Sequence, residues 1–197
     1  ATKWQKNKHK KGERGERRVE AKVEKFYTLN QKAAVVYRDL LLPKKLGGDA
    51  YTQIDIVAIT KQATILIEVK NFSGVITGDA TNKYWYQTGY KGSRRRRIYS
   101  PVYQNRPHIQ ALRSIDSTQK IIPIVLFLDT VINVDAKRDI VINEELLVPV
   151  LSKILKKKKR KNKKNIENIS SKIEKFNKPK GSKARANHLA QVKAMKN

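Results

Sequence analysis

The stretch YTQIDIVAITKQATILIEVKNF, residues 51–72, decides the fold because it predicts two apolar strands joined by a short polar turn. Charged side chains interrupt these strands at Asp55, Glu68 and Lys70. Strand side chains alternate between faces, so Glu68 and Lys70 share one face with Leu66. Both faces are otherwise apolar, which indicates a strand buried inside a sheet. Ionised groups are costly there unless they are paired or bind a metal, so these three residues need partners.

Two interpretations of these charges are open. In the first, Asp55 and Glu68 supply hard oxygen ligands from neighbouring strands, which suit Mg²⁺. A metal-bound water would attack a phosphodiester, while Lys70 orients it or neutralises charge in the transition state. In the second, Glu68 and Lys70 form a salt bridge at a solvated edge, and Asp55 is an ordinary polar residue near a strand start.

The segment before these strands predicts a helix over residues 12–29, because Val19, Val23 and Phe26 recur at helical spacing. Glu16 precedes Val19 by one helical turn and therefore shares its buried face. That face would place Glu16 against the sheet, near the acids. The alternative is a first-turn glutamate that the helix dipole favours.

A second helix is predicted to start at Ser100 and Pro101, a hydroxyl cap followed by proline. Gln104 should face the sheet if this helix is continuous, although Pro107 inside it predicts a kink. His108 follows one turn later, and we expect it to contact phosphate or to be a partly buried packing residue.

The remaining elements follow from local patterns. The expected strands are residues 33–42, 51–60, 63–72, 121–128, 131–134 and 140–142, with a hairpin formed by residues 75–77 and 84–86. Helices are expected over residues 144–155, 166–176 and 184–195. This order predicts an α/β fold with a helical extension at the C-terminal end.

Four motifs in a fixed order resemble those of the NERD (nuclease-related domain) family of bacterial proteins, within the PD-(D/E)xK nucleases. They are Gly12-Glu13-Arg14-Gly15-Glu16, Gln53-Ile54-Asp55, Glu68-Val69-Lys70-Asn71 and Ser100-Pro101-Val102-Tyr103-Gln104-Asn105. The resemblance covers the chain up to about residue 130. Glu68-x-Lys70 alone would be weak, whereas the ordered set is specific.

This resemblance implies a restriction-endonuclease-like core, in which helices flank a central mixed β-sheet. It also implies a Mg²⁺-dependent endonuclease, with Mn²⁺ as an alternative ion, that hydrolyses DNA. Asp55 and Glu68 would then be metal ligands, and Lys70 would activate water or stabilise charge. Glu16 and Gln104 would complete the catalytic set.

The charge of the chain predicts a polyanionic partner, because 44 Lys and Arg face 17 Asp and Glu, a net charge of +27. We expect DNA, with RNA not excluded, and a homodimer would suit cleavage of both strands. The residues expected to contact nucleic acid are Arg94, Arg95, Arg96, Arg97, Lys91, Gln53, His108, Lys156, Lys157, Lys158, Lys159 and Arg160. The arginine run follows the hairpin as a loop, and the alternative is a solvated loop that protects a sheet edge.

Three regions are expected: a basic flexible arm (1–11), a nuclease-like domain (12–155) and a lysine-rich, partly helical extension (156–197). No cysteine is present, which excludes disulfides and cysteine zinc sites. The longest apolar run, residues 121–128, is too short to span a bilayer, so we expect a soluble cytoplasmic protein without a membrane partner.

Two other functions are open. One is a catalytically inactive nucleic-acid-binding or assembly module that keeps the nuclease fold. The other is a ribosomal-type RNA-binding protein, which fits the lysine content but not the ordered motifs. Only the nuclease requires a metal.

Overall fold

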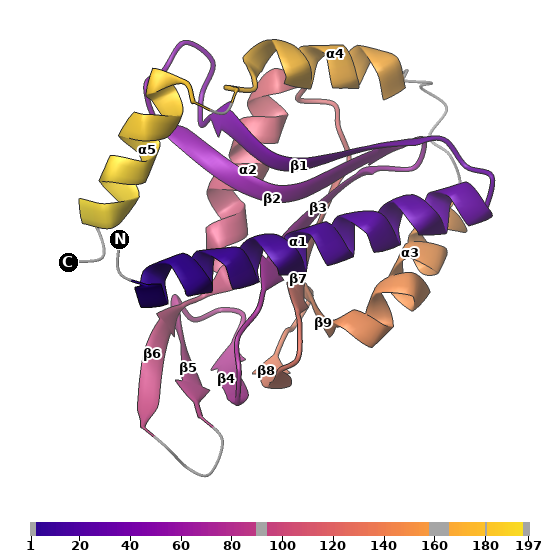
Figure 1. Ribbon diagram of the computed structural model, residues 1–197. Helices are drawn as coiled ribbons and strands as arrows, with labels where there is room; N and C mark the ends of the chain where they lie inside the picture. The colour runs from indigo at the N-terminus through magenta and orange to yellow at the C-terminus, as the bar shows by residue number, and fades with distance from the viewer. Residues whose placement is uncertain (1–2, 90–93, 158–165, 180, 195–197) are drawn as a thin grey trace.

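Two mixed β-sheets form the framework of the protein, and helices cover both faces of the larger one (Figure 1). The structure, a computed structural model, describes residues 3–89, 94–157, 166–179 and 181–194. The five-stranded sheet contains, in spatial order, β1 (Ala34–Pro43), β2 (Tyr51–Thr60), β3 (Thr64–Lys70), β7 (Ile121–Phe127) and β9 (Ile140–Asn143). The four-stranded sheet contains β6 (Arg95–Tyr99), β5 (Tyr84–Thr88), β4 (Val75–Asp79) and β8 (Val131–Asp135).

The described helices are α1 (Lys3–Leu29), α2 (Pro101–Ile115), the 3₁₀ turn η2 (Glu144–Leu146), α3 (Leu147–Leu155), α4 (Ile166–Phe176) and α5 (Lys183–Ala194). In the larger sheet, β1, β2 and β3 are antiparallel, whereas β7 and β9 run parallel to β3. This arrangement confirms the predicted α/β class with a central mixed sheet. None of the described helices combines the length and apolar character that a membrane span requires.

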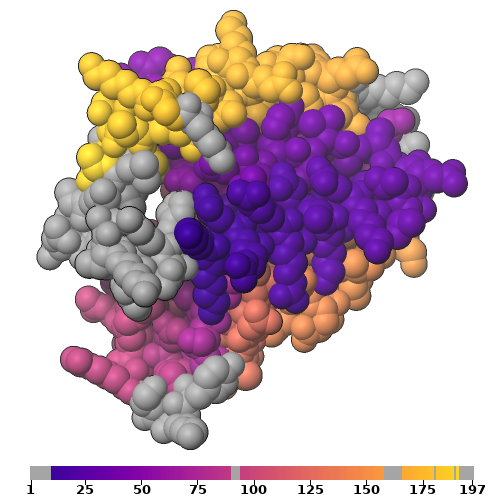
Figure 2. Space-filling model, viewed as in Figure 1, coloured from indigo at the N-terminus to yellow at the C-terminus, as the bar shows by residue number. Residues whose placement is uncertain are grey.

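Each face of the five-stranded sheet packs against its own helices. Helices α1 and α3 cover the face that carries Ile65 and Ile67, and Val19 and Val23 of α1 are fully buried there. Helices α2 and α4 cover the other face, which carries Leu66. Figure 2 shows α1 lying across the molecule between the C-terminal helices and the smaller sheet. The alternation of apolar residues in β3 therefore places Glu68 and Lys70 on the face that α2 covers.

Strands β1 and β2 break their alternation at one shared level. Tyr37 and Leu40 pack in the same cluster, as do Ile54 and Val57, although an odd spacing places side chains on opposite faces of a regular strand. Asp39 adopts a positive φ of 58° at this level. An aspartate tolerates that conformation better than most residues. The irregularity lies beside Asp55.

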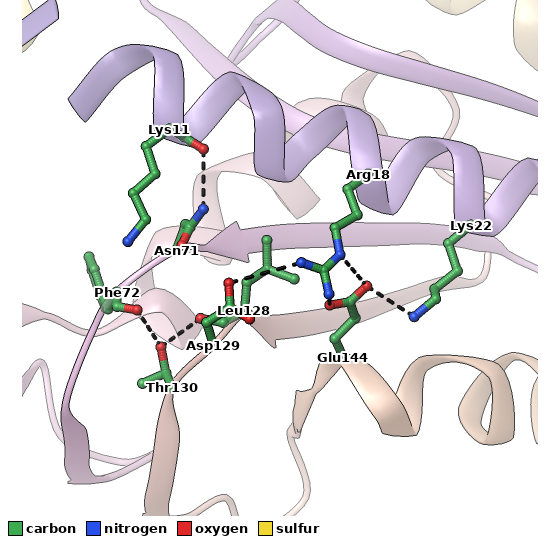
Figure 3. Close-up of polar contacts among 9 residues, drawn as sticks. All are labelled: Lys11, Arg18, Lys22, Asn71, Phe72, Leu128, Asp129, Thr130 and Glu144. Atoms are coloured by element: carbon green, nitrogen blue, oxygen red, sulfur yellow. Dashed lines mark hydrogen bonds and ion pairs between the residues drawn. The ribbon is translucent and has the colours of Figure 1, made fainter. Parts of the chain in front are cut away.

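Two sets of polar contacts, which we call clasps, hold the N-terminal and C-terminal helices to this framework. Arg18 Nε and Lys22 Nζ of α1 donate to Glu144 Oε1, at 2.8 and 3.0 Å (Figure 3). On the same helix, the carbonyl of Lys11 accepts a hydrogen bond of 3.2 Å from Asn71, just after β3 (Figure 3). The second clasp joins the edge of β1 to the C-terminal part.

This second clasp begins after α4. Asn177 Oδ1 accepts from the backbone N–H of Leu41, and the N–H of Lys178 donates to the carbonyl of Leu41, both at 3.0 Å. Arg185 of α5 then donates to Asp39 Oδ1 at 2.9 Å and to the Asp39 carbonyl at 2.6 Å. The C-terminal extension therefore docks on the core along the edge of β1.

Several elements differ from expectation. Helix α1 begins at Lys3, so residues 3–11 continue the helix instead of forming an arm. Helix α2 runs through Pro107 without interruption. Arg95 to Arg97 belong to strand β6 and not to a loop, because they pair with β5. The helix expected over residues 144–155 begins as the 3₁₀ turn η2, and the side chain of Asn143 before it donates to the carbonyl of Thr130 at 2.7 Å.

Candidate active site

Asp55 lies opposite the end of β3 because of the strand register. The β2–β3 pairing includes Ile56 with Ile67, and antiparallel continuation by one position sets Asp55 across from Glu68. Asp55 Oδ2 accepts a hydrogen bond of 2.8 Å from the backbone N–H of Val69. This bond orients the Asp55 carboxylate along the strand end that carries Glu68 and Lys70.

Glu68 and Lys70 form a buried ion pair. The side chain of Glu68 is 1% exposed and that of Lys70 is 16% exposed, and Nζ of Lys70 donates to Oε1 of Glu68. A salt bridge between them is thus present, but it does not lie at a solvated edge. Lys70 Nζ also donates to Gln104 Oε1 at 2.9 Å, so Gln104 faces the sheet as its spacing in α2 predicts.

The electrostatics separate the two carboxylates. Burial and the nearby charge of Glu68 raise the pKa of Asp55 well above its usual value. Burial also opposes ionisation of Glu68, but the Lys70 ammonium and His108 outweigh it and lower the pKa of Glu68 to about 2. For Lys70, burial is outweighed by Glu68 and Asp55, so its pKa is raised. Glu68 and Lys70 are therefore held as charges.

Glu16 of α1 approaches this group from the other side of the strand end. It is partly buried, and burial followed by the charge of Asp39 raises its pKa. Its charge acts in turn on Asp55 and Lys70. Gly15 permits the close approach of α1, because a Cβ there would lie 2.8 Å from Leu128 Cδ1.

His108 is enclosed between Glu68 and Thr52. It is 3% exposed, its Nε2 lies 3.2 Å from Glu68 Oε2, and its Nδ1 lies 2.7 Å from the hydroxyl of Thr52. This enclosure fits the packing alternative, while a contact of His108 with phosphate stays a prediction. Thr52 was missed, because a threonine in a strand carries no distinguishing signal.

The residues expected to contact nucleic acid do not converge on one surface. Arg94 to Arg97 are exposed beside β5, whereas Gln53 is exposed and donates to Asp39 Oδ1 at 2.8 Å. Lys156 and Lys157 follow α3, where the carbonyl of Leu155 accepts from Gln62 in the β2–β3 turn. That turn is at the opposite end of β3 from Glu68. Lys91, Lys158, Lys159 and Arg160 lie outside the described residues.

A divalent ion would find two carboxylates here. Across the described part of the chain, no group of three or more His, Cys, Asp or Glu is arranged to hold a metal ion. Glu68 Oε2 is nevertheless buried and makes no hydrogen bond, although His108 Nε2 lies 3.2 Å from it, and Asp55 is repelled by the charge of Glu68. Both features fit a cation that takes two protein oxygens and keeps several waters, as Mg²⁺ usually does.

Comparison with known proteins identifies one family. The family model described as nuclease-related domain matches residues 11–128. The matched part runs from α1 to the end of β7 and contains Glu16, Asp55, Glu68, Lys70 and Gln104. No curated protein and no solved structure matches the chain.

Proposed function

The chain belongs to the nuclease-related domain (NERD) family, and from this premise we propose that it is a metal-dependent endonuclease that hydrolyses phosphodiester bonds of DNA. The observation that carries the proposal is the buried Glu68–Lys70 pair, with Asp55 opposite and Gln104 on the ammonium. Burial of an ion pair opposes folding unless geometry compensates it, so such a group is expected where function needs it.

Each side chain has a role in this proposal. Asp55 and Glu68 would hold Mg²⁺, or Mn²⁺ in its place. When bound, the ion supplies Lewis acidity and a water of lowered pKa. Lys70 has a raised pKa and therefore serves as a fixed cation that neutralises charge on the phosphate oxygens, not as a general base.

The supporting side chains hold Lys70 and Glu68 in place. Gln104 positions the ammonium through its bond of 2.9 Å, and His108 encloses Glu68 from the α2 side. Glu16 adds negative charge that favours the cationic form of Lys70. We also propose a bacterial cytoplasmic setting, which the absence of cysteine supports, and a homodimer for cleavage of both strands.

A second candidate is an inactive module that binds nucleic acid without turnover. One observation favours it: Glu68 is already neutralised by Lys70 within the fold. In that case the pair would be structural and the protein would need no metal. Metal dependence separates the two candidates.

The test is cleavage of supercoiled plasmid with Mg²⁺ or Mn²⁺ and with EDTA. We expect nicked or linear product only with metal, and a loss of at least about a hundredfold in Asp55→Asn and Glu68→Gln, because direct ligands should matter more than outer-shell partners. Asp135→Asn, which changes an exposed carboxylate on β8, is the matched control and should cleave normally.

The contrary outcomes are equally specific. Cleavage that persists in EDTA or in Asp55→Asn would remove this site from the chemistry. Binding of DNA by the wild type and both variants, without product under any metal, would establish the inactive module.

A further inference from the structure

The outer face of the four-stranded sheet presents alternating tyrosine and arginine side chains on β5 and β6. Strand pairing sets Tyr84 beside Tyr99 and Tyr86 beside Arg97. Trp85, at the intervening position, is fully buried on the inner face. We call the exposed set, Tyr84, Tyr86, Arg95, Arg97 and Tyr99, the Tyr–Arg face.

The rings of this face are open to solvent. Tyr84 is 41% exposed, Tyr86 37% and Tyr99 47%. Three tyrosines on two adjacent strands leave a contiguous aromatic surface in water. Such a surface is a usual feature of a binding site rather than of a bare protein exterior.

Arginine planes and tyrosine rings are layered together on the Tyr–Arg face. The guanidinium carbon of Arg95 lies 3.7 Å from the centre of the Tyr86 ring, and that of Arg97 lies 4.5 Å from the centre of the Tyr84 ring. Tyr84 and Tyr99 meet edge to face with their centres 6.1 Å apart. A guanidinium over a ring keeps its second face free for a further planar group. The face therefore combines aromatic rings with positive charge.

Helix α2 connects the Tyr–Arg face with the candidate active site. Tyr99 contacts Tyr103 of α2 edge to face at 6.5 Å, and Arg106 lies 3.5 Å from the centre of the Tyr103 ring. The next residue after Tyr103 is Gln104, which holds Lys70. Helix α2 begins directly after β6, so one short segment joins both places (Figure 1).

The remainder of the outer face differs in charge. Its β4 and β8 corner carries Asp79 and Asp135, which share Lys137. A polyanion would therefore lie along β5 and β6, where Arg95 and Arg97 are, and not across the whole sheet. This distribution favours β5 and β6 as the location of the bound strand.

We propose that the Tyr–Arg face binds the unpaired bases of single-stranded nucleic acid and guides that strand to Lys70. The inference rests on the proposed function, in that the strand bound here is the one that the site cleaves. Aromatic rings stack on the faces of bases, and those faces are accessible only where bases are unpaired. A duplex would offer its phosphates to the arginines but nothing to the rings.

The first measurement is fluorescence anisotropy in EDTA with oligonucleotides of roughly twelve nucleotides. The probes are oligothymidylate, oligouridylate, an abasic strand with the same number of phosphates, and a duplex. Stacking of one or two bases predicts at least about tenfold tighter binding of the base-bearing strand than of the abasic strand. The DNA and RNA arms show which sugar is preferred. Equal affinity for the abasic strand, or tighter binding of the duplex, would overturn the proposal.

Variants then locate the effect. Tyr84→Leu with Tyr99→Leu should reduce the preference for bases over the abasic strand to near one, whereas Tyr84→Phe with Tyr99→Phe should keep it. Arg95→Gln removes one charge from the face. Its control is Arg113→Gln, which removes one charge from an exposed arginine in the last turn of α2. If the leucine protein fails to fold by circular dichroism, the wild-type comparison still decides. A preference that survives the folded leucine variant would overturn the assignment to this face.

These results are independent of catalysis because EDTA prevents metal-dependent cleavage. Plasmid cleavage without any preference for bases would refute this inference and leave the proposed function standing. Base-dependent binding without plasmid cleavage would refute the proposed function and leave this inference standing. The last measurement is sedimentation of the wild type without nucleic acid. If the wild type is a dimer that the leucine variant abolishes, and no strand is bound, the face joins two copies of the protein. That result would overturn the proposal.

Discussion

A lysine paired with a carboxylate two positions earlier occurs inside β3 of the larger sheet and again at the end of β8 of the smaller sheet, and the surroundings of the two pairs are opposite. In the five-stranded sheet Lys70 and Glu68 are 16% and 1% exposed, whereas Lys137 and Asp135 at the smaller sheet are 50% and 56% exposed. The same acid-x-lysine spacing therefore gives an enclosed charge pair in one place and a solvated one in the other. Burial, not spacing, separates a candidate catalytic pair from an ordinary surface contact.

The comparison extends to the rest of each sheet. Around Glu68, two neighbours are each held by a further residue. Lys70 bonds to Gln104, and His108 bonds to Thr52. On the Tyr–Arg face, side chains contact one another but remain in water. We expect changes near Glu68 to affect stability and function together, and changes on the Tyr–Arg face to affect binding alone.

The largest effect should come from Lys70→Ala. Removal of the ammonium leaves Glu68 buried without its cation, which should lower the free energy of unfolding by about 3–5 kcal/mol. Lys137→Ala is the matched control and should leave the midpoint of urea unfolding unchanged, because its pair is solvated. Equal losses of the free energy of unfolding in Lys70→Ala and Lys137→Ala would show that burial does not distinguish the two charge pairs.

An intermediate effect is expected from Glu144→Ala. Glu144 accepts from Arg18 and Lys22 of α1, and its side chain is 9% exposed (Figure 3). Loss of charged hydrogen bonds at a largely buried acceptor should cost about 2 kcal/mol in urea unfolding. The exposed neighbour Glu145→Ala should cost nothing measurable. An unchanged free energy of unfolding in Glu144→Ala would mean that burial to this degree does not strengthen a charge pair.

The effect that is smallest at neutral pH concerns a neutral buried group. Burial raises the pKa of Tyr27 from 10.0 to about 12, so the folded state keeps a proton that the unfolded chain releases first. Stability from this group is complete below pH 10.0 and declines as pH rises toward about 12. Between these values the wild type should lose more stability than Tyr27→Phe. Parallel pH profiles of the two proteins in urea unfolding would contradict the shift.

Much of the fold could be predicted because the signals are local. The bounds of β2 were predicted to the residue, since turn-forming and polar residues flank a mainly apolar run at both of its ends. The site could be anticipated because Asp55, Glu68 and Lys70 are charges in apolar strands, and the ordered motifs added Glu16 and Gln104. Family membership is confirmed, while the roles of these residues stay a proposal.

The remainder depended on contacts between distant segments. His108 was expected either to contact phosphate or to pack in part against the core, but its partners Thr52 and Glu68 could not be named because they are fixed by how α2 crosses the sheet. The arginine run was predicted to be a loop because of its charge, and the sequence gives no signal that β6 pairs with β5. Arg185 carries no motif, and only the folded chain brings it to Asp39. None of these relations has a signature in sequence spacing.

The clasp on β1 has a consequence for the protein as it is being made. β1 is the outer strand of the five-stranded sheet, and its backbone at Leu41 is bonded by Asn177 and Lys178, with Arg185 on Asp39 nearby. A ribosome releases β1 long before these residues, so a growing chain has this strand edge open to pairing with other chains. The segment between α4 and α5, together with Arg185 of α5, closes this edge and is synthesised well after β1, so the edge stays exposed to aggregation until that segment has emerged and docked.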